Sequence, residues 1–343
     1  MRTIGVERPD TKVGVILGVD THLDFHVAVA IDHLGRRLGE SSVPTTVKGY
    51  EKLLRWAEGF GPLRCAGVEG KSSYGAGLAR HFKAKAIEVL EVERPKRRRR
   101  SSRRHVEKSD PSDAESAARA VLAGEASGAP KSADGRVEMI RVLRASRRSA
   151  MKARTQAANQ LQGLRVTAPD ELLDRLRGLS TKTKDLVSVA ARFRLRDDPR
   201  DVPSATKFAL RSVAHRYEAL SAEISELEAH LDRLVAQAAP ELISLPGIGT
   251  ENAATLLIVA GDNPQRLGSE ASFASLCGAA PIEASSGKVV RHRLNRGGNR
   301  EANRVLYMIC LARMRRDLRT QEYVARRTAE GKSKREIIRC LKL

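Results

Sequence analysis

Four acidic residues stand at positions from which side chains commonly bind metal ions. Asp20 ends a nearly continuous apolar run, Glu69 ends a second one, and Asp110 and Asp113 open a segment with helical spacing. Residues three apart on a helix share one face, so Asp110 and Asp113 project from the same end of that helix. Carboxylate oxygens are the ligands that Mg²⁺ prefers, and two such ions about 4 Å apart can hold the attacking and leaving oxygens of a phosphodiester. The four acids therefore predict a two-metal site for phosphodiester chemistry.

A simpler interpretation applies to part of this set. Asp110 as an N-cap, followed by Pro111 and by Asp113 at the third helical position, is a helix-capping signature that needs no metal. Four carboxylates that converge without a cation would raise one another's pKa, and this favours the metal site. His22, close to Asp20, is interpreted as a packed or hydrogen-bonded neighbour in preference to a ligand.

A second place for chemistry is the serine pair Ser285-Ser286, which precedes Gly287. Basic residues and one histidine follow within fifteen positions and could hold a scissile phosphate and stabilise its extra negative charge. These residues are Lys288, Arg291, His292, Arg293, Arg296 and Arg300. A Ser-Gly pair is ordinarily just a turn, and no general base accompanies it in the sequence. An acid of the N-terminal domain or its metal would have to supply that base.

The charge balance indicates a polyanionic partner. The chain of 343 residues has 62 Lys and Arg against 41 Asp and Glu, a formal net charge of +21. Each phosphate that a protein neutralises releases counterions, so nucleic acid is the expected ligand. Eight of the eleven residues of 94–104 are basic, and we expect an arm that contacts nucleic acid, although such runs are often only solvated. Its residues include Arg97, Arg98, Arg99, Arg100, Arg103 and Arg104.

An α/β domain over 12–130 is expected to position the acids. Apolar runs predict three tightly joined strands, then a helix, a strand, a helix and a strand. The expected ranges are 13–20, 25–31, 36–43, 47–60, 64–69, 74–83 and 86–92. This order, with an acid ending the first and fourth strands, matches the ribonuclease-H-like (RuvC-like) layout. The segment 108–122 follows and is expected to be a helix with its start.

The middle, 137–238, is expected to hold two long helices over 137–166 and 205–238, separated by a loop-prone stretch after Pro169. Apolar residues at three-to-four spacing predict a coiled-coil seam on the second helix. They are Leu220, Ile224, Leu227, Leu231 and Leu234. An antiparallel hairpin within the chain and a contact between two chains explain this seam equally well.

A mainly helical C-terminal domain is expected over 239–343. Its segment Leu245-Pro-Gly247-Ile-Gly249 precedes an apolar helix and indicates a helix-hairpin-helix, in which glycines let backbone N–H groups reach a DNA phosphate. The alternative is an ordinary tight turn between helices.

Cysteine usage and hydropathy bound the environment. Four cysteines without paired spacing argue against a zinc site and against disulfides, and favour a reducing compartment. No apolar run approaches the roughly 20 residues of a membrane span. We expect a cytoplasmic, nucleoid-associated protein without a membrane partner.

Five motifs in this order resemble the DEDD insertion-sequence transposases, which are related to the Piv-type DNA invertases and act as bridge-RNA-guided recombinases. The motifs are Gly18-Val-Asp20-Thr-His22, Gly67-Val-Glu69-Gly70, Lys108-Ser-Asp110-Pro-Ser-Asp113-Ala-Glu115, Leu245-Pro-Gly-Ile-Gly249 and Pro281-Ile-Glu-Ala-Ser-Ser286-Gly287. The resemblance covers nearly the whole chain, which ends at Leu343 in an expected helix that relatives continue.

The resemblance implies the roles of the site residues. Asp20, Glu69, Asp110 and Asp113 would form a RuvC-like tetrad for Mg²⁺. Ser286, with Ser285 as the fallback, would be a nucleophile that links covalently to DNA. A noncoding guide RNA of the element would pair with donor and target DNA, and the protein would act as a dimer that pairs into a tetramer on DNA.

Two rival functions stay open. In a metal-dependent Holliday-junction resolvase, the tetrad would hydrolyse DNA and Ser286 would be only a turn residue. In a non-catalytic nucleic-acid-binding protein, Asp110 and Asp113 would serve the helix start alone.

Overall fold

The computed structural model describes residues 14–69, 74–92, 109–126, 135–179, 182–195, 200–262, 267–287, 289 and 291–343. The chain divides into two compact units, Met1–Gly135 with Ala260–Glu270 and Arg136–Val259 with Ala271–Leu343. Each is considered by itself. None of the described helices is both long and apolar enough to cross a membrane.

The first unit is built on a five-stranded sheet in the order β3-β2-β1-β4-β5. β1, β2 and β3 are antiparallel neighbours, whereas β4 and β5 run parallel to β1. The strands are β1 (Val15–Thr21), β2 (Phe25–Ile31), β3 (Arg37–Pro44), β4 (Leu63–Glu69) and β5 (Glu88–Val92). The predicted strand and helix order is confirmed, and the chain has the mixed α/β N-terminal domain expected of a DEDD nuclease fold.

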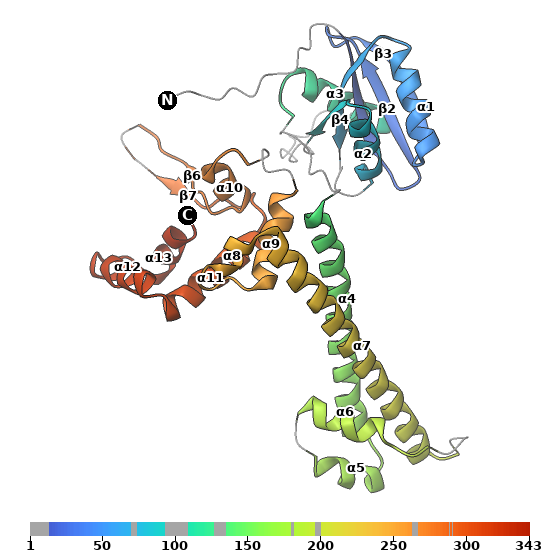
Figure 1. Ribbon diagram of the computed structural model, residues 1–343, viewed down its shortest axis with the longest axis vertical. Coiled ribbons are helices and arrows are strands. Elements are labelled where there is room, and N and C mark those ends of the chain that lie inside the picture. The colour runs from blue at the N-terminus through green and yellow to red at the C-terminus, as the bar shows by residue number, and fades with distance from the viewer. Residues whose placement is uncertain are drawn as a thin grey trace, which may run out of the picture. The chain divides into compact units, whose positions relative to one another are not determined.

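Helices cover both faces of this sheet (Figure 1). α1 (Val47–Glu58) and α2 (Ala76–Ala84) pack on one face, where Leu17, Leu53 and Phe82 are buried together. α3 (Asp110–Leu122) covers the other face, against Ile16 and its neighbours on β2 and β4. The alternation along β1 thus sends successive side chains into two separate apolar layers.

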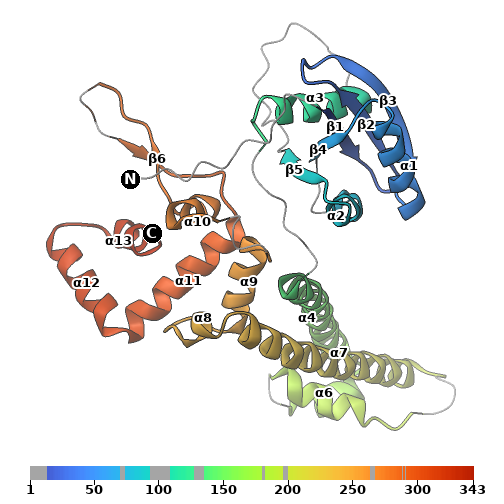
Figure 2. The same ribbon diagram turned by 45° about the horizontal axis from the view of Figure 1, so that its top comes forward.

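The second unit contains a long antiparallel hairpin of α4 (Arg136–Val166) and α7 (Val202–Ala238), visible in Figure 2. The start of α4 packs against the end of α7, and the end of α4 packs against the start of α7. Ile224 and Leu231 of the predicted seam are buried. The structure therefore contains the predicted hairpin within the chain, and a contact between two chains stays a prediction.

The stretch after Pro169 is more ordered than its sequence indicates. α5 (Asp170–Arg177) and α6 (Thr183–Ala191) close the far end of the hairpin, where Leu172, Leu176 and Leu186 are buried against α4 and α7. The prediction of a loop there is wrong for these two segments, because their apolar side chains gain a core only once α4 and α7 have paired.

The C-terminal part of the second unit is mostly helical, as predicted. Its helices are α8 (Pro240–Ser244), α9 (Thr250–Ala260), α10 (Glu270–Leu276), α11 (Arg300–Arg316), α12 (Leu318–Ala329) and α13 (Lys334–Leu341). Two short strands, β6 (Ile282–Glu283) and β7 (His292–Arg293), form an antiparallel pair between α10 and α11. A small core joins α9, α10 and α11 around Cys277 and Val305.

Candidate metal centre and serine hairpin

Two glycines bring the acidic residues of the first unit together. A Cβ on Gly18 of β1 would lie 1.9 Å from the Ala114 carbonyl oxygen, and one on Gly67 of β4 would lie 2.8 Å from the Ala117 carbonyl oxygen. Real Cβ atoms never come so close, so only glycine lets the α3 backbone approach the sheet. Since Asp110 begins α3 and Asp20 lies near the end of β1, this approach sets their separation.

Asp20, His22 and Asp110 form a compact cluster of possible ligands, with one ligand atom of each within 4.8 Å of the others. His22 Nε2 lies 3.3 Å from Asp20 Oδ2 and 3.4 Å from Asp110 Oδ2. The three residues differ in exposure, because Asp20 is buried whereas His22 and Asp110 are half-buried.

The electrostatics of the cluster favour a cation. Burial raises the pKa of the Asp20 carboxyl above its usual range. His22 lowers that pKa, whereas the carboxylates of Asp110 and Asp113 raise it further. A divalent ion among these oxygens would remove the repulsion between them.

The other two acids of the set lie at the margin of this cluster. Asp113 shares the first turn of α3 with Asp110 and is near enough to act on the pKa of Asp20. Glu69 ends β4, beside the end of β1, and its backbone carbonyl accepts a 2.8 Å hydrogen bond from Thr21 Oγ1. The Glu69 carboxylate is not among the three groups of the cluster in the described part of the chain.

The start of α3 corrects the capping interpretation. Ser109 is the N-cap, and Asp110 is the first residue of the helix. Asp110 therefore does not fill the position that the capping signature gives it, and its carboxylate faces His22. Both acids still lie in the first turn of α3, where the helix dipole favours negative charge.

A divalent cation fits the residues that are present. The Nε2 atom of His22 is buried and forms no hydrogen bond within the described residues, although two carboxylates face it. A buried nitrogen without a hydrogen bond beside carboxylate oxygens matches the donor set of a bound metal ion. The sequence favoured His22 as a packed or hydrogen-bonded neighbour over a ligand, because one histidine near an acid does not by itself indicate a metal site.

Ser286 lies at the tip of the β6–β7 hairpin in the second unit. Its backbone exchanges two 3.1 Å hydrogen bonds with Val289, and Gly287 has a φ of +57°, which favours glycine. The Ser285 hydroxyl accepts a 3.2 Å hydrogen bond from the Arg291 backbone N–H. The Ser286 side chain is exposed, and its hydroxyl makes no hydrogen bond among residues whose placement is described. The two serines therefore differ: Ser285 holds the hairpin and Ser286 presents a hydroxyl.

Basic side chains accompany this hairpin. Arg291, Arg293 and Arg296 are all exposed. In the described part of the chain none of the three forms an ion pair, so each guanidinium can receive a phosphate. Lys288 and the run Arg97, Arg98, Arg99, Arg100, Arg103 and Arg104 lie outside the described residues.

The base of the hairpin is fixed by a close backbone crossing. A Cβ on Gly298 would lie 2.2 Å from the Gly278 backbone nitrogen. Asn303 Nδ2 donates to the carbonyl oxygens of Cys277 and Gly278 at 2.9 and 3.1 Å. Lys342 Nζ donates to Asn303 Oδ1 at 3.0 Å, so α13 supports the same point.

The turn between α8 and α9 contains the two predicted glycines. Gly247 has a φ of +84°, and its Cβ would meet Ala312 and Arg313 of α11 at 3.2 and 3.3 Å. Gly249 faces open space. The backbone at Gly247 is explained by turn conformation and packing, and a role of either glycine in binding DNA stays a prediction.

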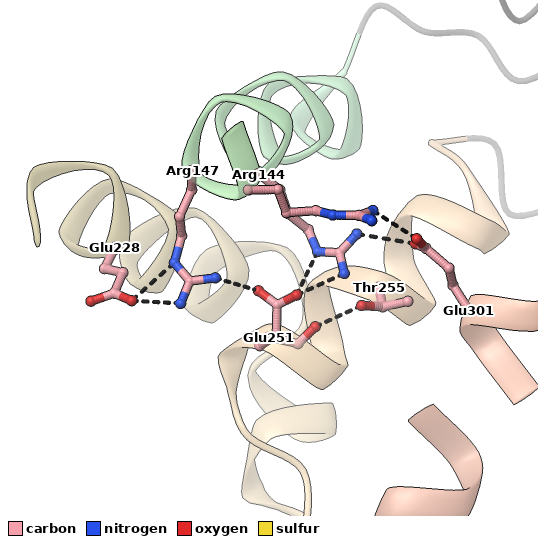
Figure 3. A network of polar contacts seen from close by, with 7 residues as sticks. Arg144, Arg147, Glu228, Glu251, Thr255 and Glu301 are labelled. Atoms are coloured by element: carbon pink, nitrogen blue, oxygen red, sulfur yellow. Dashed lines mark hydrogen bonds and ion pairs between the residues drawn. The ribbon is translucent and has the colours of Figure 1, made fainter. Parts of the chain in front are cut away.

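A network of ion pairs joins α4 to the first turns of α9 and α11 (Figure 3). The buried Arg144 donates to Glu251 of α9 at 2.8 Å and to Glu301 of α11 at 3.3 Å. Arg147 donates to Glu228 of α7 at 2.9 Å and to Glu251 at 3.1 Å. Arg144 and Arg147 of α4 thus have a structural role, because they hold the first turn of α9 and the start of the helix that follows the serine hairpin.

Comparisons with known proteins cover both candidate sites. Residues 17–167 are similar to a DEDD-type transposase family of the IS110 kind, described as "Transposase". Residues 239–325 are similar to the family described as "Transposase IS116/IS110/IS902 family". A protein of Streptomyces coelicolor, the insertion element IS110 uncharacterized 43.6 kDa protein, is 36% identical over 134 residues. This match spans 38% of the present chain and 31% of the relative's length.

Proposed function

Since this chain belongs to the IS110/IS116/IS902 family of DEDD-type insertion-sequence transposases, we propose that it cuts and rejoins DNA at the ends and target of such an element. The observation that carries this proposal is the cluster of Asp20, His22 and Asp110, with Asp113 beside it, inside the region similar to the DEDD transposases. Glu69 completes the proposed tetrad from the neighbouring strand end.

The proposed role of the acids is to bind Mg²⁺, most simply as a two-metal site. Bound ions would supply charge that stabilises the phosphorane-like transition state and would orient the scissile phosphate. The carboxylates of Asp20 and Asp110 would hold the ions, and those of Asp113 and Glu69 would contribute further oxygen ligands. The buried position of Asp20 strengthens its interaction with a cation, because water screens that charge less.

Ser286 is the proposed nucleophile. Its Oγ forms a bond to the phosphorus while the bond from phosphorus to one sugar oxygen breaks; the serine proton passes to water, and the sugar oxygen that leaves takes up a proton from water. Attack by the sugar hydroxyl of another strand then reverses the step and releases the serine. Arg291, Arg293 and Arg296 stabilise the charge on the phosphate. The exposed Ser286 hydroxyl, compared with the engaged hydroxyl of Ser285, supports this choice.

We also propose that a guide RNA of the element pairs with donor and target DNA, and that the protein works as a dimer and as a tetramer on DNA. The net charge of +21 and the low aromatic content of 3% support a protein that binds phosphates and leaves base recognition to pairing. Gly247 and Gly249 would contribute backbone contacts to a phosphate.

Strand exchange on DNA carrying the element's ends tests this function. The wild-type protein with Mg²⁺ and the flanking RNA should produce joined products, and Asp20→Asn should abolish them. Asp32→Asn, in the turn between β2 and β3, is the matched control and should retain activity. Cleaved but unjoined products, retained in Ser286→Ala, would indicate a metal-dependent resolvase instead.

A further inference from the structure

The imidazole of His22 lies against two carboxylates of the acidic set. Its Nε2 lies within 3.3 and 3.4 Å of oxygens from two different carboxylates, Asp20 and Asp110. That nitrogen is buried, although the side chain as a whole is 36% exposed. The buried end of the ring thus points into the acids and the exposed end points away from them.

The hairpin between β1 and β2 holds this ring in place. The His22 backbone N–H donates to the Phe25 carbonyl at 3.1 Å, and the two rings stack with centroids 4.9 Å apart. Ligands that are oriented before binding lose less entropy when the ion arrives. The His22 ring is therefore already oriented for binding a metal ion before the ion arrives.

An imidazole changes which ions a carboxylate site prefers. All-oxygen sites suit Mg²⁺ and Ca²⁺, whereas nitrogen ligands favour the first-row transition metals. We propose that His22 Nε2 binds the metal ion together with Asp20 and Asp110, and that this centre consequently prefers Mn²⁺ to Mg²⁺. The proposal rests on the proposed function, because it assumes that the acidic set binds a metal, and it adds a ligand and a selectivity to that set.

Pulsed electron paramagnetic resonance on the full-length protein with one equivalent of Mn²⁺ tests the coordination directly. Wild type should show modulation from a directly bound imidazole ¹⁴N, and His22→Gln should lose it. His33→Gln changes an exposed histidine of the turn between β2 and β3 and should keep the signal. The wild-type spectrum decides the point even if the His22 variant proves unstable.

Calorimetric titration of Mn²⁺ and Mg²⁺ tests the selectivity. Wild type should bind Mn²⁺ at least about tenfold more tightly than Mg²⁺, and His22→Gln should weaken Mn²⁺ about tenfold or more while changing Mg²⁺ less. Asp20→Asn should lose both ions.

The possible failures separate the two proposals. Binding of both ions at Asp20, without a ¹⁴N signal and with unchanged selectivity in His22→Gln, would overturn the role of His22 and leave the metal-dependent function standing. Tighter binding in His22→Gln would also overturn it, since His22 would then act as a cation that competes with the metal. No binding of either ion by wild type would contradict the proposed metal centre itself.

Discussion

Replacing Arg144 by methionine should destabilise the second unit by much more than a typical surface change. The Arg144 side chain is only 6% exposed and contacts Glu251 and Glu301. Removing one member of a buried ion pair costs about 3–5 kcal/mol. The two glutamates are 45% and 44% exposed, so water replaces part of the lost contacts. We therefore expect a loss of about 2–3 kcal/mol.

Arg148→Met is the matched control for this prediction. Arg148 also contacts Glu301, at 2.6 Å, but its side chain is 57% exposed. Exposed pairs contribute about 0–1 kcal/mol, so this variant should lose far less. Both free energies of unfolding can be measured by urea denaturation.

The optical signals of the chain help to assign the transition. Circular dichroism at the helix band follows mainly the helical second unit, whereas the single tryptophan, Trp56 in α1, follows the first. The reasoning is refuted if Arg144→Met shifts the dichroism midpoint no more than Arg148→Met does.

Three further variants or conditions give distinct expectations. Gly18→Ala must push α3 away from β1 and displace Asp110, so it should lower the free energy of unfolding by about 1–3 kcal/mol. It should also reduce the rise in melting temperature that Mg²⁺ produces. Gly163→Ala is the control, because its Cβ meets nothing within 4 Å, and it should raise the free energy of unfolding by roughly 0.5–1 kcal/mol. An unchanged Mg²⁺ effect in Gly18→Ala would contradict the proposed positioning. Gly298→Ala should disrupt the base of the serine hairpin and abolish strand joining, with normal metal titration as the check; retained joining would show that the Gly278 crossing is not needed. Burial raises the pKa of the Cys65 and Cys277 thiols to about 11, which favours their neutral forms. Their alkylation in the native protein, followed by mass spectrometry, should be slow at neutral pH and accelerate as pH rises towards that value, and equal rates in native and denatured protein would disprove it.

The strands of the first unit were predictable because their apolar runs are long and their turns short. β1, β2 and β4 begin and end within two residues of the expected ranges. The helix that follows was predicted to end at Leu122, as observed, but with Asp110 as its N-cap, whereas the N-cap is Ser109. Local sequence decides these elements, since burial on both faces of a sheet needs an unbroken apolar run.

Elements whose stability comes from distant contacts were missed. α5 and α6 are short and gain a core only from α4 and α7, and β6 and β7 are exposed two-residue strands without apolar alternation. The acidic residues of the site could be predicted from their types and positions, but their arrangement in space could not. Asp20 and Asp110 meet because Gly18 and Gly67 admit the α3 backbone, a packing requirement that no spacing rule reveals.

Trapping of a covalent protein–DNA adduct tests the central claim most directly. The protein would be incubated with divalent metal, the flanking RNA and labelled junction DNA, then separated on a denaturing gel. The proposed mechanism predicts an adduct in wild type and in Ser285→Ala, and none in Ser286→Ala. Free cleaved DNA without an adduct in wild type, or an adduct that persists in Ser286→Ala, would contradict it.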